Sequence, residues 1–434
     1  MKFSKKLAAA LATGLILLGT AACSNGGSSS SGTSTDKIPA KITKKTTVVF
    51  WNGMTGVQQE TLKKLTQKFE QKNPNITVKL ENQGAYNDLQ AKINSTLQSP
   101  NNLPTITQAY PDWLYTASKN KLLVDLKPYI NNQNVGWGST AASKIKPALL
   151  TGAQIGGVQY GIPFNKSIET LTYNADMFKK YGIEKAPATM AELKQDAQII
   201  YTKSHHQVVG AGFDSLSNYY ALGMKNEGVD FSSKIDFNGT TSKKVINYYA
   251  DGIKAGYFEI AGSEHYLSGP FANQKVAMYI GTSAGEGFVK KGVGNRFTYD
   301  VAPRPGKYTM QQGTDIYMFK HATAEQKAAA FMYIKFLVSK SSQLEWANAT
   351  GYIPVNQEVV DSKEYKANKK IKLPAKLEDA MKNLYSVPVV KNAGAAYSEL
   401  NPIMQNILSA AQKKQAVDNA IKSGKSKFDA AWQQ

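Results

Sequence analysis

The feature that most limits the possible folds of this chain is an alternation of strand-like and helix-like segments in residues 46–108. Strands are predicted where β-branched and aromatic residues gather, and helices where large apolar residues recur at every third or fourth position. This βαβαβ order predicts an α/β fold, in which a mostly parallel sheet carries helices on its faces. The predicted elements are Thr46–Trp51, Gln58–Lys72, Ile76–Leu80, Tyr86–Leu97 and Leu103–Gln108.

A second alternating region and the chain length predict a second lobe. A chain of 434 residues is longer than one ordinary core accommodates, and its 42% hydrophobic content is enough for sizeable cores. Residues 376–432 are predicted to be largely helical. Further strands are expected at Gln207–Phe213, Lys275–Ile280 and Thr314–Phe319, and further helices at Ala188–Thr202 and Ala324–Val338.

The stretch between residues 158 and 178 is predicted to connect the two lobes. Pro163 and the glycine two residues before it favour a stiff, non-helical crossing. Asn165 and Ser167 follow and supply an amide and a hydroxyl, just before a β-branched strand. A rigid crossing with polar groups of fixed geometry suits a ligand cleft between two lobes.

Aromatic and polar residues stand together at the carboxyl ends of three predicted strands. These positions are Trp51–Asn52, Ala85–Tyr86 and Tyr110–Trp113. Ligands of parallel sheets bind outside the carboxyl ends of the strands. We therefore expect ligand contacts from this edge of the first sheet.

The N-terminus has the features of a bacterial export signal. A basic start precedes the short apolar run Leu7–Leu18, and small residues stand directly before Cys23, the only cysteine. The pattern resembles the lipobox of bacterial lipoproteins, which implies a cleaved signal peptide over residues 1–22 and lipid acylation of Cys23. Residues 23–40, rich in serine and glycine, would be a flexible tether. An ordinary signal peptide with an incidental cysteine is the alternative.

The strongly basic composition does not by itself indicate nucleic-acid binding. The net charge is +20, but only Arg296 and Arg304 are arginines among 52 basic residues. Arginine is the residue that reads phosphate and guanine bidentately, so a lysine-rich chain is more simply a solvated surface. Adhesion to an anionic polymer or membrane through this basic surface stays as an alternative, and its binding would weaken with salt. Four histidines and one cysteine predict no metal site, and no cofactor is expected.

A short glycine-rich segment raises the possibility of catalysis. Gly281, Ser283 and Gly285 match the G-x-S-x-G elbow of serine hydrolases after a predicted strand, and Asp300 or Asp315 and then His321 follow in hydrolase order. Glycines beside a serine suit a ligand-binding loop equally well. Only 38 residues separate the serine from the histidine, which is short for the elements that normally intervene, so we favour a binding loop. A glycosidase-type pair among Asp112, Asp214 and Glu169 is a further alternative that the sequence does not resolve.

Four stretches together resemble the extracellular solute-binding proteins, family 1, which deliver ligands to ABC importers. They are Thr47–Trp51, Tyr160–Asn174, Ala277–Ala284 and Thr350–Asn356. Within the family, the order and the residues of these stretches are most similar to those of the glycerol-3-phosphate-binding branch, which is closely related to sugar-binding members. The resemblance implies a two-lobed periplasmic-binding-protein fold that closes at a hinge. We place the lobes at residues 41–163 with 315–355, and at 164–314 with 356–434.

The resemblance also implies cleft positions, and two departures from that branch bear on the ligand. In that branch an acidic residue directly follows the tyrosine after the third strand, whereas here Pro111 follows and Asp112 comes next. The branch also binds phosphate with an arginine near the carboxyl end, but no arginine follows Arg304 in this chain, so a bidentate phosphate clamp is missing. Lys391 is the alternative point charge. The family positions fall on Tyr86, Ser167, Ser283, Gly313, Tyr352 and Tyr397.

A neutral sugar or polyol is therefore the expected ligand, with glycerol-3-phosphate or a glycerophosphodiester as the alternative. We expect hydrogen bonds from Asp112, Asp214, Asn165 and Ser283, and stacking on Trp51, Trp113, Tyr219 or Tyr352. The predicted protein is a monomeric, non-enzymatic lipoprotein on the extracytoplasmic face of the cell membrane. Its predicted partners are a small solute and an ABC permease, with no nucleic acid.

Overall fold

The computed structural model describes residues 37–138, 144–262, 265–368 and 371–433, and the chain from Ile38 onward forms one compact unit. The predicted signal peptide, Cys23 and most of the predicted tether lie outside the described residues. Within the described part of the chain, none of the helices has the length and apolar character needed to span a membrane.

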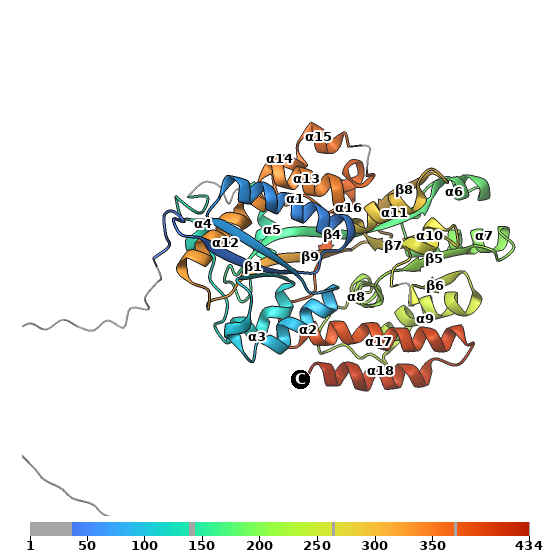
Figure 1. The fold of residues 1–434 in the computed structure, drawn as a ribbon. Coiled ribbons are helices and arrows are strands. Elements are labelled where there is room, and N and C mark those ends of the chain that lie inside the picture. Colours follow the sequence, from blue (N-terminus) through green and yellow to red (C-terminus); the bar gives the residue numbers. More distant parts are fainter. Residues whose placement is uncertain (1–36, 139–143, 263–264, 369–370, 434) are drawn as a thin grey trace, which may run out of the picture. The chain divides into compact units, whose positions relative to one another are not determined.

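One ten-stranded sheet runs through the unit in the order β2-β1-β3-β9-β4-β7-β5-β6, with β10 beside β9 and β8 beside β4 (Figure 1). β1 is parallel to β2 and β3, and β5 is parallel to β6 and β7. β4 is antiparallel to β7, β8 and β9, and β9 is antiparallel to β3 and β4 but parallel to the short β10. The parallel groups thus flank an antiparallel centre. The strands are β1 (Thr46–Asn52), β2 (Ile76–Asn82), β3 (Ile106–Ala109), β4 (Gly161–Asn174), β5 (Val209–Phe213), β6 (Phe258–Ile260), β7 (Val276–Thr282), β8 (Tyr299–Pro303), β9 (Thr309–Met318) and β10 (Leu384–Tyr385).

Helices cover the sheet and form most of the chain after residue 323. In the first half they are α1 (Gly56–Lys72), α2 (Tyr86–Thr96), η1 (Pro100–Asn102), η2 (Pro111–Leu114), α3 (Tyr115–Lys119), α4 (Lys127–Ile130), α5 (Pro147–Gly152), α6 (Ala175–Tyr181), α7 (Met190–Lys203) and α8 (Leu216–Asn226). In the second half they are α9 (Thr240–Ala255), α10 (Ser268–Ala272), η5 (Ser283–Gly285), α11 (Glu286–Val293), α12 (Ala324–Leu337), α13 (Lys340–Thr350), α14 (Gln357–Val360), α15 (Lys363–Lys366), η6 (Leu373–Lys376), α16 (Leu377–Ala380), α17 (Ala393–Gln412) and α18 (Asp418–Ala431).

The predicted elements are confirmed, with shifts of a few residues at their ends. α7 begins as the sequence indicates, because the Thr189 hydroxyl accepts from the Glu192 amide while the Glu192 carboxylate accepts from the Thr189 amide. The stiff, non-helical crossing predicted at Pro163 is formed by a strand and not by a turn. Pro163 lies inside β4, where the register with β9 shifts between Pro163 and Asn165, and such an irregularity tolerates a residue without an N–H.

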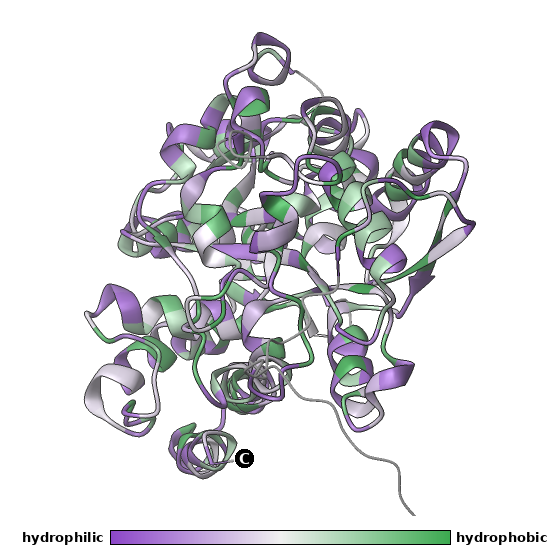
Figure 2. Ribbon diagram, turned by 90° about the vertical axis from the view of Figure 1, so that its left-hand side faces the viewer, coloured by the Kyte–Doolittle hydropathy of each residue, from purple (hydrophilic) through white to green (hydrophobic). Residues whose placement is uncertain are grey.

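Two large hydrophobic cores occupy different parts of the unit. The first joins β1 and β2 to α1, α12 and α13, and the second joins β5 and β7 to α7, α8, α9, α17 and α18. β4 and β9 enter both: Phe164 and Ile316 lie in the first core, Leu171 and Met310 in the second. Figure 2 shows hydrophobic and hydrophilic residues mixed around the helices, as expected where one face of each helix is buried.

Candidate functional site

Two neighbouring cavities lie where β4 and β9 pass between the cores. We name them the Trp113 cavity, of about 240 Å³, and the Phe288 cavity, of about 360 Å³. Both are lined by Tyr86, Tyr110, Gln312 and Gly313, which form their shared wall. Both cores supply lining residues to the Trp113 cavity, Tyr86 on the side of the first core and Met310 and Tyr397 on the side of the second, so a molecule that fills this cavity contacts both.

The shared wall is held by a buried hydrogen-bond network. The fully buried Asn165 amide donates to the Tyr86 hydroxyl over 2.8 Å, and that hydroxyl lies 3.1 Å from the hydroxyl of Tyr352. The Asn165 Oδ1 accepts from Gln108 Nε2 and from Thr314 Oγ1, at 3.1 and 2.7 Å. Asn165 thus fixes the Tyr86 ring from behind, which preorganises the wall for a ligand.

Gly313 is required by the geometry of this wall. Its φ is +89°, and a Cβ built there would lie 1.9 Å from the Asn165 carbonyl oxygen. The absence of a side chain lets its amide donate to the Tyr110 hydroxyl over 3.0 Å, while its carbonyl accepts from Lys166 Nζ over 3.1 Å. A glycine is therefore the residue that permits β4 and β9 to approach here.

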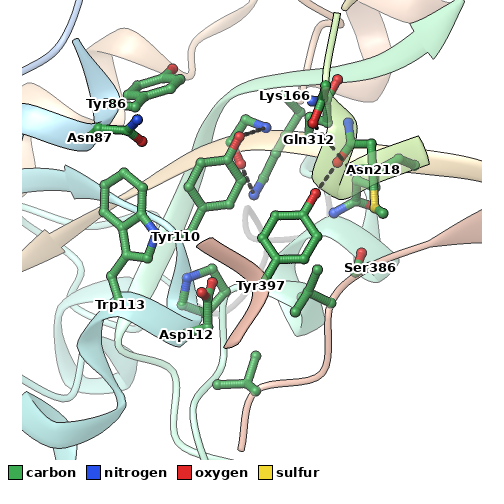
Figure 3. A pocket seen from close by; sticks show the side chains of 18 residues that line it. Tyr86, Asn87, Tyr110, Asp112, Trp113, Lys166, Asn218, Gln312, Ser386 and Tyr397 are labelled. Carbon is green, nitrogen blue, oxygen red and sulfur yellow. Dashed lines mark hydrogen bonds between the residues drawn. The ribbon is translucent and has the colours of Figure 1, made fainter. Parts of the chain in front are cut away.

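Aromatic rings dominate the Trp113 cavity (Figure 3). The ring of Tyr110, the residue before η2, and the ring of Trp113, in η2, have centroids 5.1 Å apart, and Tyr86 packs edge-on to both. From α17, Tyr397 projects toward the same space, and its hydroxyl donates to the Asn218 side chain. Burial raises the pKa of Asp112, which lies beside these rings, to about 6.

Charge in the two cavities is acidic rather than basic. Among the described residues that line them, Lys166 is the one cation, and its Nζ is already paired with the buried Asp315 at 2.6 Å. Asp112 lines the Trp113 cavity and Asp214 lines the Phe288 cavity. Burial raises the pKa of Asp214 to about 7 although the Leu267 amide donates to its Oδ1 over 2.7 Å.

Eight of the twelve predicted binding residues line a cavity in the structure. They are Tyr86, Asp112, Trp113, Ser167, Asp214, Gly313, Tyr352 and Tyr397. Which of them touch a ligand stays a prediction.

The other four lie outside the cavity linings. Trp51 was expected to stack on ligand, but its ring is buried in a core with Leu89 and its Nε1 donates to Glu81 Oε2 over 2.9 Å. Tyr219 is buried between Phe213 and Tyr249 in the second core, which likewise removes its ring from the cleft.

Asn165 and Ser283 lie close behind the lining rather than in it. Asn165 supports Tyr86, as described above. The Ser283 Oγ accepts from the Ile168 amide over 3.4 Å, while its chain neighbours Thr282 and Ala284 line the Phe288 cavity. At the family position Ser283, it is therefore the two chain neighbours that line the cavity.

Several lining residues were not predicted. Tyr110 and Lys166 stood within stretches that the sequence singled out, so their neighbourhood was correct. Other lining residues that were not predicted include Asn218, Gln312, Tyr266 and Phe288. Tyr266 and Phe288 carry no local sequence pattern, because only the tertiary fold brings them to the cleft.

The hydrolase arrangement is not assembled in the described residues, although β7, η5 and α11 do provide the strand–turn–helix context. The His321 Nε2 pairs with the Pro104 carbonyl oxygen at 3.1 Å. Asp315 is bound to Lys166, and the Asp300 Oδ2 accepts from the Tyr173 hydroxyl. Lys391, the alternative point charge, is exposed and lines neither cavity. No group of three or more histidine, cysteine, aspartate or glutamate side chains in the described part of the chain is arranged to hold a metal ion.

Solved structures share this architecture. The glycerophosphocholine complex of UgpB from Mycobacterium tuberculosis matches with a TM-score of 0.76 and 17% identity, over 89% of this chain and 98% of that one. The Listeria monocytogenes protein Lmo0181 with cycloalternan matches at 0.77 and 18%, over 89% and 99%. Maltose-bound MalE3 of T. maritima matches at 0.72 and 20%, over 88% and 98%. The chain therefore has the two-lobed fold of periplasmic binding proteins, as predicted.

The family itself follows from the sequence match. The model for bacterial extracellular solute-binding proteins matches residues 64–373, and the chain belongs to this family. A curated relative is the sn-glycerol-3-phosphate-binding periplasmic protein UgpB of Salmonella typhimurium, 24% identical over 330 residues, which are 71% of this chain and 74% of the relative. The predicted class, a solute-binding protein of an ABC importer, is thereby confirmed.

Proposed function

We propose that this protein captures a neutral sugar or polyol in the two cavities and presents it to an ABC permease. The observation that carries the proposal is the charge of the cavities. The one lining cation among the described residues, Lys166, is already neutralised by Asp315, and two carboxyl groups face the cleft. Carboxylates accept hydrogen bonds from hydroxyl groups, and an uncompensated carboxylate disfavours a phosphate nearby.

A glycerol-3-phosphate or glycerophosphodiester ligand is the second candidate. The names of two relatives favour it, since one binds glycerol-3-phosphate and another was solved with glycerophosphocholine. A phosphate monoester, however, is normally held by arginine or by unpaired lysine. Arg304 is bound to Glu169 and only 4% exposed, so its guanidinium is committed elsewhere.

The proposed mechanism is closure of the two lobes on the solute. We assign residues 41–163 with 315–355 to one lobe and 164–314 with 356–434 to the other. Trp113 then belongs to the first lobe, and Asp214 and Tyr397 to the second. A solute that contacts both sides favours the closed state by its differential affinity, and the closed state is the form that docks on the permease.

Export and anchoring complete the proposal. Cleavage before Cys23 would remove residues 1–22, and acylation of Cys23 would hold the monomer at the extracytoplasmic face of the membrane through the tether of residues 23–40. The basic start, the short apolar run and the single cysteine at the cleavage site support this assignment. Stable anchoring requires more than one acyl chain, which a lipoprotein cysteine carries.

A thermal-shift screen tests the ligand class. Sugars, polyols, glycerol-3-phosphate and glycerophosphocholine are each added at millimolar concentration to the folded, soluble part of the chain. A ligand with micromolar affinity stabilises the protein by about 4 kcal/mol. We expect shifts from neutral sugars or polyols. Shifts from phosphorylated ligands alone would replace the proposal by its alternative, and the absence of any shift would contradict both.

A further inference from the structure

We propose that the Phe288 cavity is a second sugar subsite, so that the solute has at least two linked sugar units, one in each cavity. This inference rests on the proposed function and specifies its ligand. Four observations carry it: the exposure of two aromatic side chains, the contact of Phe288 across the cavity, the continuity of the two cavities, and the hydrogen-bonding groups between them.

The first observation is where the protein exposes large apolar side chains. In the described residues these are Tyr266, at 58% exposure, Phe288, at 41%, and Val390. Tyr266 and Phe288 both line the Phe288 cavity, although one precedes α10 and the other lies on α11. Exposed apolar groups that converge on one cavity from two elements indicate a binding surface.

The second observation places Phe288 across the cavity from the first lobe. Gly56 begins α1 with a φ of +50°, and a Cβ built there would lie 3.2 Å from the Phe288 ring. The ring therefore contacts the backbone of α1 while a large part of it stays open to solvent. In this position the exposed face of the Phe288 ring is free to contact a ligand, and its edge contacts the opposite lobe.

The third observation is that the two cavities are contiguous. They share Tyr86, Tyr110, Gln312 and Gly313. Small-molecule sites usually have volumes of about 300–1,000 Å³. The Trp113 cavity, at about 240 Å³, is below this range alone, and with the Phe288 cavity of about 360 Å³ the site falls well within it. The combined space suits a ligand of more than one ring.

The fourth observation concerns polar groups at and beyond the junction. The Gln312 Oε1 is buried at the shared wall and has no hydrogen-bond partner among the described residues. In the Phe288 cavity, the Ser167 Oγ accepts from Thr282 Oγ1 over 3.0 Å, which leaves the Ser167 hydroxyl proton to donate. Asp214 supplies an acceptor beside it. Acceptors and a donor beside aromatic faces match a sugar, which has hydroxyl edges and an apolar face.

A quaternary ammonium group is the competing occupant, because aromatic rings with a carboxylate also bind such cations. In a glycerophosphodiester the phosphate would then fall near the shared wall. The one cation among the described lining residues is Lys166, whose Nζ is paired with Asp315 and with the Gly313 carbonyl. The charge around the junction therefore favours a neutral linkage.

The experiment is calorimetric titration with paired probes. Glucose is compared with maltose, mannose with mannobiose, and glycerophosphocholine is a separate arm. We expect at least one disaccharide to bind about tenfold or more tightly than its monosaccharide. Phe288→Ala and Tyr266→Ala should weaken the disaccharide by about five- to tenfold more than the monosaccharide, whereas Phe288→Tyr should retain the wild-type affinity.

Lys290→Ala is the matched control, because Lys290 is exposed on the same helix and lines neither cavity. Thermal denaturation of each ligand-free variant checks folding. Equal affinities within each sugar pair, or equal losses for both members in Phe288→Ala, would overturn the second subsite while leaving the proposed function intact. Tight binding of glycerophosphocholine that depends on Phe288 would overturn it in favour of a cation. Failure of every probe sugar, together with no thermal shift from any sugar or polyol in the screen above, would instead remove the proposed function itself.

Discussion

Two buried ion pairs lie three residues apart on β4 and differ in how they are built. Lys166 Nζ lies 2.6 Å from Asp315 Oδ1, with side chains 4% and 0% exposed. Glu169 Oε2 accepts from Arg304 Nε over 3.0 Å, with side chains 3% and 1% exposed. An odd spacing on a strand places Lys166 and Glu169 on opposite faces. Burial raises the pKa of both carboxyl groups, and the cation beside each opposes this rise.

The first pair is compact, whereas the second belongs to a network. Within the described residues, the Lys166 Nζ contacts β9 alone, through Asp315 and the Gly313 carbonyl. Glu169 also accepts from Asn218 Nδ2 over 2.8 Å, and Asn218 in turn holds the Tyr397 hydroxyl. The second pair therefore connects β4 and the residue after β8 to a tyrosine of the Trp113 cavity. The cations differ too, since a buried lysine can become neutral by releasing its proton and an arginine cannot.

The largest expected effect comes from Glu169→Gln. The substitution leaves the Arg304 guanidinium buried without a carboxylate, and this charge cannot be removed. We expect the free energy of unfolding in urea to fall by about 3–5 kcal/mol. Ligand affinity should fall as well, because an amide keeps one acceptor oxygen where the carboxylate has two, so Arg304 competes with Asn218 for it and Asn218 is held less firmly toward Tyr397.

A double variant, Glu169→Gln with Arg304→Met, is the control for this prediction. Replacing both charges leaves no unpaired ion, so most of the stability lost in the single variant should return. A single variant that is destabilised by less than about 1 kcal/mol would mean that the network does not depend on the ion pair.

Asp315→Asn is expected to have the second largest effect, about 2–3 kcal/mol near neutral pH, because Lys166 can escape its unpaired state by losing a proton. The cost should therefore shrink when unfolding is repeated at about pH 9.5, where proton release is easier. The cost of Glu169→Gln should not shrink. Equal pH behaviour of the two variants would contradict the distinction between the cations.

An exposed pair gives the baseline for both measurements. Lys244 Nζ lies 2.6 Å from Glu227 Oε2, with side chains 67% and 34% exposed. Solvent and salt screen such a pair, so Glu227→Gln should change the free energy of unfolding by less than about 0.5 kcal/mol.

Local sequence patterns predicted the elements well, because periodicity and caps act over a few residues. Thr189 and Glu192 cap α7 within one turn. The carboxyl-end rule also brought Tyr86, Asp112 and Trp113 to the cleft. Glu169 and Arg304, which form an ion pair, are 135 residues apart in the sequence, so no local sequence pattern predicts their contact. Local patterns also led to the prediction that Trp51 and Tyr219 stack on ligand. An aromatic residue that faces a core and one that faces a cleft have the same local sequence pattern.

The smallest effect, and the one most specific to the site, concerns a carboxyl group whose pKa is lowered by no cation among the described residues. Asp214 lines the Phe288 cavity, and burial, with a contribution from Glu169, raises its pKa from 3.8 to about 7. Between these values the folded state binds more protons than the unfolded state, so this group lowers stability as pH rises through the window. The side chain is partly exposed to the cleft, so we expect about 1–2 kcal/mol between pH 5 and pH 8 rather than the full value for three pKa units.

Asp214→Asn should remove this dependence. The amide oxygen can still accept from the Leu267 amide, so the variant should be more stable than the wild type at pH 8 and about equal to it at pH 5, as measured by urea unfolding without ligand. Sugar affinity should behave in the opposite way, because a ligand hydroxyl that donates to Asp214 favours the ionised form and binds more tightly as pH rises from 5 to 8. If the sugar affinities of the wild type and the variant change with pH in the same way, Asp214 does not contact the ligand. The contrast between Glu169, paired with a cation, and Asp214, facing the ligand, would then be wrong.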